Sequence, residues 1–429
     1  MNKLLLLVVS CVLLVLMGCG STALPVPNAF LYAANSFRPG SISAFNVTQG
    51  ALSHITGSPF ATTGNAPYSA AAVSTKFLYA SVPATSKGGV ITRVLGRTLS
   101  GSVTGGILLM AMRNDHTLEV PQMFATGGDY DPIAVTPGGS FLYAADLSSN
   151  HLAAFSIDSS KGTLAAIGPQ GPPPGVAVGP DPFNVVVDPQ GKFVFVANCD
   201  FTNPSSLGSV SVFSINSDGT LAAVPGSPFL LGGGASHPVA LAVSSDSQFL
   251  FVASLDDQVY VETIAANGAL ADALPGTPSV SLPAGTTPVS IAISIDGGDT
   301  VYTGNAGTHT VSFFLNCMQT PVPSGCSTDS NGNPLAPLAF QNNTSVGGTV
   351  GVVVPDPTTV AATSTTSAIN AGHFLYVTDY DHGTILVFSV TSTTSCATPP
   401  CTPAPGTLTQ SGSAVITGGA NPFGLAVAH

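Results

Sequence analysis

One short β-type motif recurs in seven near-copies along the chain, and this repetition limits the possible folds more than any other feature. A unit that recurs at intervals of about 50 residues is typical of arrays such as propellers. Each unit buries its apolar face only against its neighbours, so the 429 residues need not form separate domains. The copies are Phe30–Asn35, Phe77–Ser81, Phe141–Asp146, Phe193–Asn198, Phe249–Ser254, Thr300–Asn305 and Phe374–Asp379.

Three further strands follow each motif. The first alternates Val, Ile and Phe with small polar residues, as a half-buried strand does. It is predicted at Ser41–Val47, His151–Ile157, Ser209–Ile215, Gln258–Ile264, Thr310–Leu315 and Thr384–Val390. The next strand starts at a Gly-x-Leu turn such as Gly219-Thr220-Leu221. The last is a small apolar segment that begins at Pro, and its continuous apolar character is typical of a strand covered on both faces. It is predicted at Pro132–Val135, Pro182–Val187, Pro238–Val243 and Pro288–Ile293.

These units predict an all-β fold, a seven-bladed β-propeller with four-stranded antiparallel blades over residues 29–429. The chain begins on the motif at Phe30 without its preceding strand, and Asn421–His429 has the sequence of that missing strand. We therefore expect the N- and C-terminal strands to pair in one blade and close the ring, which removes exposed sheet edges. The strands of the second unit, Lys76–Phe124, are not placed by the pattern.

The charge of the chain limits its partners. Net charge is −12, with only nine Lys and Arg, so there is no basic stripe to displace counterions from a nucleic acid. We expect no nucleic-acid partner, and a monomer.

The N-terminus has the features of an export signal. Lys3 precedes the apolar run Leu4–Leu16, which is too short to span a membrane comfortably and suits a signal peptide. The run ends in Leu16-Met17-Gly18-Cys19, which resembles a bacterial lipobox. We expect residues 1–18 to be removed, Cys19 to be lipidated and residues 19–28 to form a tether. The alternative is an ordinary signal peptide cut after Ala23. In the first case the protein contacts the membrane only through its lipid, on the outer membrane or cell surface.

Cysteine spacing suggests local disulfides. In an exported protein, Cys317 with Cys326 and Cys396 with Cys401 are two close pairs inside loops rich in Pro, Ser and Thr. No His or further Cys lies at zinc spacing. Cys199 is expected to be a buried, inert thiol.

The repeated pattern resembles the YVTN-repeat and lactonase-like seven-bladed propellers. The matching segments are F-L-Y-V-A-N, G-x-L, G-S-P-F and the Pro-led strand, and they extend over Ala29–His429. The family includes enzymes similar to 6-phosphogluconolactonase, whose typical segment P-H-x-N-x-x-x-x-D-P-x-G-K-F corresponds to Pro182–Phe193. Asn184 and Asp188 match it, although Asp188 is also suited to shaping a turn. Phe183 stands at the His position, and His237-Pro238 one unit later resembles the family's His-Pro.

Candidate site residues share one end of the predicted ring. In an antiparallel blade, the loops after the motif and the loops before the Pro-led strand lie at the same end. The acidic and histidine residues of these loops are Asp129, Asp131, Asp146, Asp181, Asp200, Asp256, Asp257, Asp379, Asp381, His237 and His382. We expect them around one mouth of the central channel.

Two interpretations of these carboxylates remain open. They could bind a ligand or a divalent cation such as calcium, or raise one another's pKa; no cofactor is otherwise required. They could instead cap turns by accepting backbone hydrogen bonds. The residues predicted to bind a ligand are Asp129, Asp131, Asp146, Asp200, Asp256 and Asp379.

Two functions follow from these interpretations. The first is an envelope-anchored scaffold that binds a small molecule, a glycan or a protein at the acidic mouth. The alternative is a lactone hydrolase that uses His237, His382 and Asp381. The hydrolase requires His237 and at least one Asp to converge across the channel.

Overall fold

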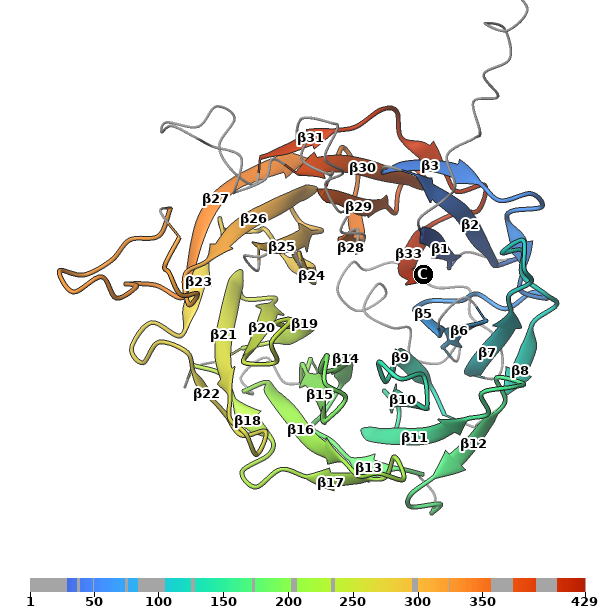
Figure 1. Ribbon diagram of the computed structural model, residues 1–429, viewed down its shortest axis with the longest axis horizontal. Helices are drawn as coiled ribbons and strands as arrows, with labels where there is room; N and C mark the ends of the chain where they lie inside the picture. The colour runs from blue at the N-terminus through green and yellow to red at the C-terminus, as the bar shows by residue number, and fades with distance from the viewer. Residues whose placement is uncertain are drawn as a thin grey trace, which may run out of the picture.

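The chain forms a ring of seven antiparallel sheets around a central axis (Figure 1). The computed structural model describes residues 29–36, 39–48, 50–73, 76–83, 105–124, 128–171, 174–201, 207–232, 236–294, 300–323, 325–355, 373–390 and 407–428. The predicted seven-bladed propeller is confirmed. No helix long and apolar enough to span a bilayer occurs in these residues.

The blades are numbered in chain order and their strands are given from the axis outward. Blade 1 has β33 (Pro422–Ala428), β1 (Ala29–Asn35), β2 (Ser41–Thr48) and an outer strand in two pieces, β3 (Ala51–His54) and β4 (Phe60–Ala61). Blade 2 has β5 (Ala70–Val73), β6 (Phe77–Val82), β7 (Gly106–Ala111) and β8 (Gln122–Phe124). Blade 3 has β9 (Tyr130–Val135), β10 (Phe141–Asp146), β11 (His151–Ile157), and β12 (Leu164–Ile167) with β13 (Val176–Ala177). Blade 4 has β14 (Pro182–Val187), β15 (Phe193–Asn198), β16 (Ser209–Ile215), and β17 (Leu221–Ala223) with β18 (Phe229–Leu230).

The remaining blades follow the same order. Blade 5 has β19 (Pro238–Val243), β20 (Phe249–Ser254), β21 (Gln258–Ile264), and β22 (Leu270–Asp272) with β23 (Ser279–Ser281). Blade 6 has β24 (Pro288–Ser294), β25 (Thr300–Asn305), β26 (Thr310–Asn316) and β27 (Leu338–Ser345). Blade 7 has β28 (Val350–Pro355), β29 (His373–Asp379), β30 (Thr384–Val390), and β31 (Leu408–Gln410) with β32 (Val415–Ile416).

The ring closes in blade 1, as predicted. β1 pairs with β33 in a register that runs from Phe30 opposite Ala428 to Asn35 opposite Pro422. Each inner strand contacts the next around the axis, and β33 contacts both β28 and β5. Two segments from opposite ends of the sequence therefore complete one sheet (Figure 1).

The outer strands differ from the single continuous strand that the sequence suggested. In five blades the outer position is divided into two short pieces that pair with the same third strand. In blades 1 and 4 the break is the Ser-Pro-Phe motif, where Pro59 and Pro228 have no N–H to donate. At the break the preceding serine gives the third strand an acceptor, since Ser58 Oγ accepts from the Ala44 N–H (2.9 Å) and Ser227 Oγ from the Val212 N–H (2.8 Å).

The aromatic positions of the motif join each blade to the next. Tyr143 donates its hydroxyl hydrogen bond to the Gly219 carbonyl oxygen in the Gly-x-Leu turn of blade 4 (3.0 Å). Tyr79 does the same with Gly162 in blade 3 (2.6 Å). A Cβ added at Gly219 would lie 2.3 Å from the Phe141 ring, so the turn must be glycine for the ring to pack there. The motif and the Gly-x-Leu turn are thus two halves of one contact between blades.

The Asn that ends the motif is a buried clamp. Asn198 Nδ2 donates to Ser209 Oγ (3.1 Å) and Ser211 Oγ (2.9 Å) on β16. Asn35 makes the same pair of bonds to two serines of β2, and Asn305 bonds Thr310 and Ser312 of β26. Buried polar groups need such partners, so the repeated Asn is explained by blade structure.

The cysteine predictions can be tested in part. Cys317 and Cys326 form a disulfide, as predicted. Cys199 is buried and forms no disulfide, also as predicted. Cys19, Cys396 and Cys401 lie outside the described residues, as do residues 1–28, which were assigned to the signal peptide and tether.

Candidate functional site

The candidate residues lie in loops and strand ends at one end of the ring, which we call end I. At end I the second strand of each blade finishes and its inner strand begins. Strand bounds place there the candidates Asp129, Asp131, Asp146, Asp181, Asp200, Asp256, Asp257, Asp379, Asp381, His237 and His382. The disulfide loop between β26 and β27 lies at the opposite end.

An apolar cluster, which we call the plug, lies at end I. Its buried members pack against one another and come from six blades. They are Tyr68, Leu147, Phe183, Cys199, Val239, Tyr380 and Phe423. Phe183, which stands where the resemblance places a histidine, is one of them and is only 3% exposed. The buried residues that pack together at end I are therefore apolar.

Asp131 lies at a small cavity beneath the plug. This cavity has a volume of about 140 Å³ and is lined by residues of the inner strands, including Asp131, Asn184 and Ser290. Burial and the charge of neighbouring Asp129 raise the pKa of Asp131 well above its usual range. A hydrogen bond from Ser81 Oγ (3.3 Å) opposes this shift only in part. The surroundings of Asp131 therefore favour its neutral form over the anionic form that a cation ligand requires.

Two of the predicted ligand-binding carboxylates occupy the clamp position of the motif. Asp146 and Asp379 stand where blades 1, 4 and 6 have Asn35, Asn198 and Asn305. Asp146 Oδ1 accepts from the backbone N–H of Ser148 (2.9 Å) and of Asp129 (3.2 Å). Asp379 Oδ1 accepts from the N–H of Asp381 and His382. These contacts are those of turn capping.

Three more carboxylates hold loops at end I. Asp257 accepts from the N–H groups of Gly285 and Thr287, both at 2.7 Å. Asp381 accepts from the N–H of Thr349 (2.9 Å) and from its hydroxyl (2.6 Å). Asp256 accepts from the Tyr260 hydroxyl (2.8 Å). Asp188, at the opposite end, caps its own turn by accepting from Lys192 and Phe193, as the sequence suggested.

His382 and Asp379 form the one histidine–carboxylate pair among the described residues. His382 Nδ1 lies 2.7 Å from Asp379 Oδ2. The Asp379 side chain is 5% exposed and the His382 side chain 62% exposed. This hydrogen bond, with the charge of Asp379, raises the pKa of His382 above its ordinary value. A Cβ at Gly348 would lie 2.2 Å from Asp379 Oδ1, so the adjacent loop must be glycine to admit the pair.

His237 is not brought to this pair. It is half-buried in blade 5, and its backbone N–H donates to Ser254 Oγ (2.8 Å). Blade 6 lies between it and His382 in blade 7. No hydrogen bond or ion pair within the described parts of the chain joins the His237 ring to a carboxylate. The convergence that the hydrolase hypothesis requires of His237 is thus not made by direct contact, and its place in a catalytic site stays a prediction.

The described residues include no group of three His, Cys, Asp or Glu side chains arranged to hold a metal ion. The carboxylates are instead distributed among turns of different blades. Among the predicted calcium ligands, Asp146 and Asp379 thus cap turns, and Asp379 also forms an exposed pair with His382.

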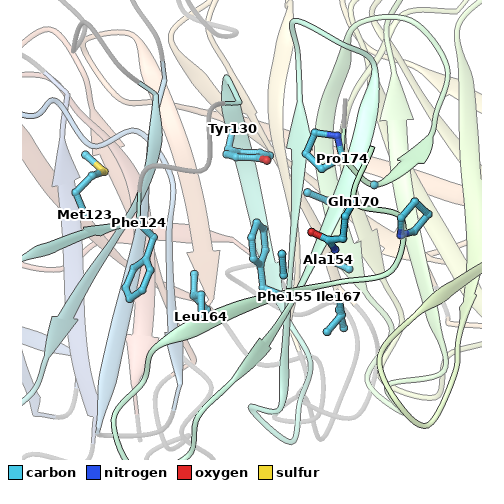
Figure 2. Close-up of a pocket in the computed structure, with 13 residues that line it drawn as sticks. Met123, Phe124, Tyr130, Ala154, Phe155, Leu164, Ile167, Gln170 and Pro174 are labelled. Carbon is cyan, nitrogen blue, oxygen red and sulfur yellow. The ribbon is translucent and has the colours of Figure 1, made fainter. Parts of the chain in front are cut away.

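A second cavity lies away from this site and was not found from the sequence. It has a volume of about 430 Å³ and lies between blades 2 and 3. Figure 2 shows Met123 and Phe124 on one side of Tyr130 and Phe155, with Gln170 and Pro174 on the other. No motif marks it, although the register gives a signal: Ala153 stands where blades 5 and 7 have Tyr260 and Leu386.

Comparisons with solved structures show the same architecture. A protein from Lactobacillus plantarum superposes with a TM-score of 0.64 at 16% identity over 94% of this chain and 100% of that one. A Bacteroides fragilis protein provisionally described as a 6-phosphogluconolactonase also has a TM-score of 0.64, at 17% identity over 94% and 98%. The periplasmic gluconolactonase PpgL of Pseudomonas aeruginosa has a TM-score of 0.59 at 18% identity over 94% and 99%. At these identities the likeness concerns the fold.

A comparison with curated proteins gave no match. The profile of the family described as "Lactonase, 7-bladed beta-propeller" matches residues 97–315, which is just over half of the chain. The sequence motifs, the closed ring and this match agree. The chain therefore belongs to the lactonase family of seven-bladed β-propellers.

Proposed function

We propose that this propeller is a binding scaffold that engages a ligand or partner across end I. The observation that carries the proposal is the apolar plug, which includes Phe183 where the resemblance places a histidine. Phe201, which is 37% exposed, lies above it with its ring 6.4 Å from that of Phe183. An apolar centre with a polar rim is the usual anatomy of a recognition surface.

The carboxylates around the plug support this role. Because Asp146, Asp257 and Asp381 are held by backbone N–H groups, their loops present a fixed shape to a partner. A preorganised surface loses less conformational freedom on binding. The partner can be a small molecule, a glycan or a protein, and the acidic rim disfavours an anionic one.

Site-specific photocrosslinking in envelope fractions tests the scaffold. A photoreactive phenylalanine analogue at Phe201 is expected to give a saturable adduct, and the same analogue at Ile416, which is exposed on the outer strand of blade 7, is expected to give none. Equal labelling at both positions, or none at Phe201, contradicts the proposal.

Lactone hydrolysis is the second candidate, and the His382–Asp379 pair favours it. A histidine oriented by a buried carboxylate is an arrangement that general-base hydrolysis uses. The solved structures similar to this chain include one named as a gluconolactonase. In this alternative His382 acts with Asp381, and His237 contributes from blade 5.

The rate at which the protein opens glucono-1,5-lactone, measured as proton release, tests this alternative. If it is right, His382→Ala removes turnover and the exposed His309→Ala does not. The rate of the wild type then rises with pH through the raised pKa of His382, because the base form is required. Under the scaffold proposal, neither protein opens the lactone faster than buffer.

The proposal includes export and anchoring. Residues 1–18 direct export and Cys19 carries the lipid, which leaves the ring at the outer membrane or cell surface. Mass spectrometry of the mature N-terminus is expected to give diacylglyceryl-cysteine. A free residue following Ala23 would instead identify the secreted form.

A further inference from the structure

At the cavity between blades 2 and 3, the third strand carries a smaller residue than the other blades have at the same register. At the same register, the third strand carries serine in blades 1, 4 and 6, and these serines bond the Asn clamp. The blades without that clamp fill the position with Leu108, Tyr260 and Leu386. Blade 3 has neither the serine nor a large side chain at this position. It carries Ala153, which lines the cavity.

The walls of the cavity are fixed and aromatic. Tyr130 and Phe155 are buried and meet edge to face, with ring centroids 6.1 Å apart. A Cβ at Gly128 would lie 2.6 Å from the Tyr130 ring, so this glycine lets the ring lie against the wall. Met123 and Phe124 of β8 complete the opposite side (Figure 2).

Residues that follow β12 and precede β13 form the rim. The Gly175 N–H donates to the Pro169 carbonyl oxygen (3.0 Å), which holds these two residues together. Gln170 Nε2 donates to the Gly168 carbonyl oxygen (3.0 Å), which fixes the carboxamide at the rim. A Cβ at Gly175 would lie 2.3 Å from the Leu152 carbonyl oxygen, so Gly175 itself rests directly on β11.

We propose that this cavity binds one neutral, ring-containing apolar molecule, with its ring against Tyr130 and Phe155 and a polar end at Gln170. None of the lining residues is charged, and the net charge of the chain is −12, so the site does not favour an anion. Apolar cavities of about 150 Å³ stay dry and accept benzene. The volume here, about 430 Å³, accommodates two or three rings.

N-phenyl-1-naphthylamine is a suitable probe because it is neutral, aromatic and fluorescent in apolar surroundings. Titration of the wild-type protein is expected to show saturable binding of one molecule, with a dissociation constant on the order of 10 µM. Ala153→Leu introduces the residue that blades 2 and 7 carry at this register and is expected to weaken binding at least about tenfold. Ala271→Leu adds the same side chain to an exposed position of blade 5 and is expected to leave binding unchanged.

Photolabelling of the wild type provides a measurement that does not depend on a variant. A diazirine derivative of the probe is expected to label peptides that contain residues 123–130 or 153–175. Labelling confined to other peptides, non-saturable binding, or equal binding by Ala153→Leu overturns the proposal. Labelling at Phe201 would assign the probe to end I instead.

Discussion

Glu262 is a carboxylic acid inside the contact between two blades. It is 2% exposed, on the same face of β21 as Tyr260 and Ile264, which pack against blade 4. It lies directly opposite Asp272 of β22, and one of its carboxyl oxygens has no hydrogen-bond partner among the described residues. Burial, with the charge of Asp272, raises the pKa of Glu262 to about 8.

This residue is expected to make stability depend on pH. The folded state keeps the Glu262 proton up to pH about 8, whereas the unfolded chain releases it near 4.5. The contribution of Glu262 to stability is therefore fully present below pH 4.5 and falls as pH rises through this window, by on the order of 4 kcal/mol. Glu262→Gln is expected to remove this part of the slope and to raise the free energy of unfolding at pH 8.

Urea unfolding of the wild type and of Glu262→Gln is measured from pH 4.5 to 9. The difference between their free energies of unfolding at each pH isolates Glu262, because the other titrating groups are common to both proteins. Glu119→Gln is the matched control, because the Glu119 side chain is 51% exposed. It should preserve the wild-type slope. If the free energy of unfolding of Glu262→Gln depends on pH as that of the wild type does, the buried carboxyl is not the cause of the pH dependence.

At this scale the sequence could not separate a binding carboxylate from a turn cap. Asp146 and Asp379 have the residue type and spacing of either role. Their register identifies them as turn caps, because they stand at the position of the Asn clamp and accept hydrogen bonds from backbone N–H groups. Phe183 was visible as a substitution in the sequence, but its place in the plug depends on contacts from six blades.

Strands were the most predictable elements. Third strands such as His151–Ile157 and Ser209–Ile215 have the predicted bounds because their alternation has period two. The third strand of blade 2, Gly106–Ala111, was not placed, since its buried run Gly-Ile-Leu-Leu-Met-Ala has no alternation. The divided outer strands were missed because a two-residue piece carries no period.

The Gly-x-Leu turn is expected to be sensitive to one methyl group. Gly219 and Gly412 have similar φ values, +82° and +78°, so alanine causes similar backbone strain at both. Only Gly219 also faces the Phe141 ring. Gly412→Ala is expected to cost about 1 kcal/mol, and Gly219→Ala about 2 kcal/mol more from overpacking. Equal losses in denaturant unfolding would mean that the aromatic contact does not constrain the turn.

The molecule as a whole depends on the contact between the last strand and blade 2. Gly424 of β33 lies so close to the chain before β5 that a Cβ there would be 2.4 Å from the Tyr68 carbonyl oxygen. The obstacle is backbone, which cannot rotate away as a side chain can. The closing blade is thus fitted to its neighbour as tightly as the blades that are continuous in sequence.

Gly424→Ala is expected to destabilise the ring by about 2 to 3 kcal/mol, because the inner strands must separate to admit the methyl group. Gly171→Ala, whose Cβ meets nothing within 4 Å, is expected to be neutral or slightly stabilising. Thermal and urea unfolding measure both variants. If Gly424→Ala unfolds like the wild type, the inner strands at the closing blade can move apart without loss of stability.

Pairing of β1 with β33 also sets the order in which the chain can be completed. A ribosome releases β1 first and β33 last, so the first strand waits with one edge unpaired until nearly every other residue has been made. Throughout synthesis that edge is available to any other extended chain, including a nascent copy of the same protein. Whatever accompanies the unfinished chain must therefore shield its beginning until its end arrives.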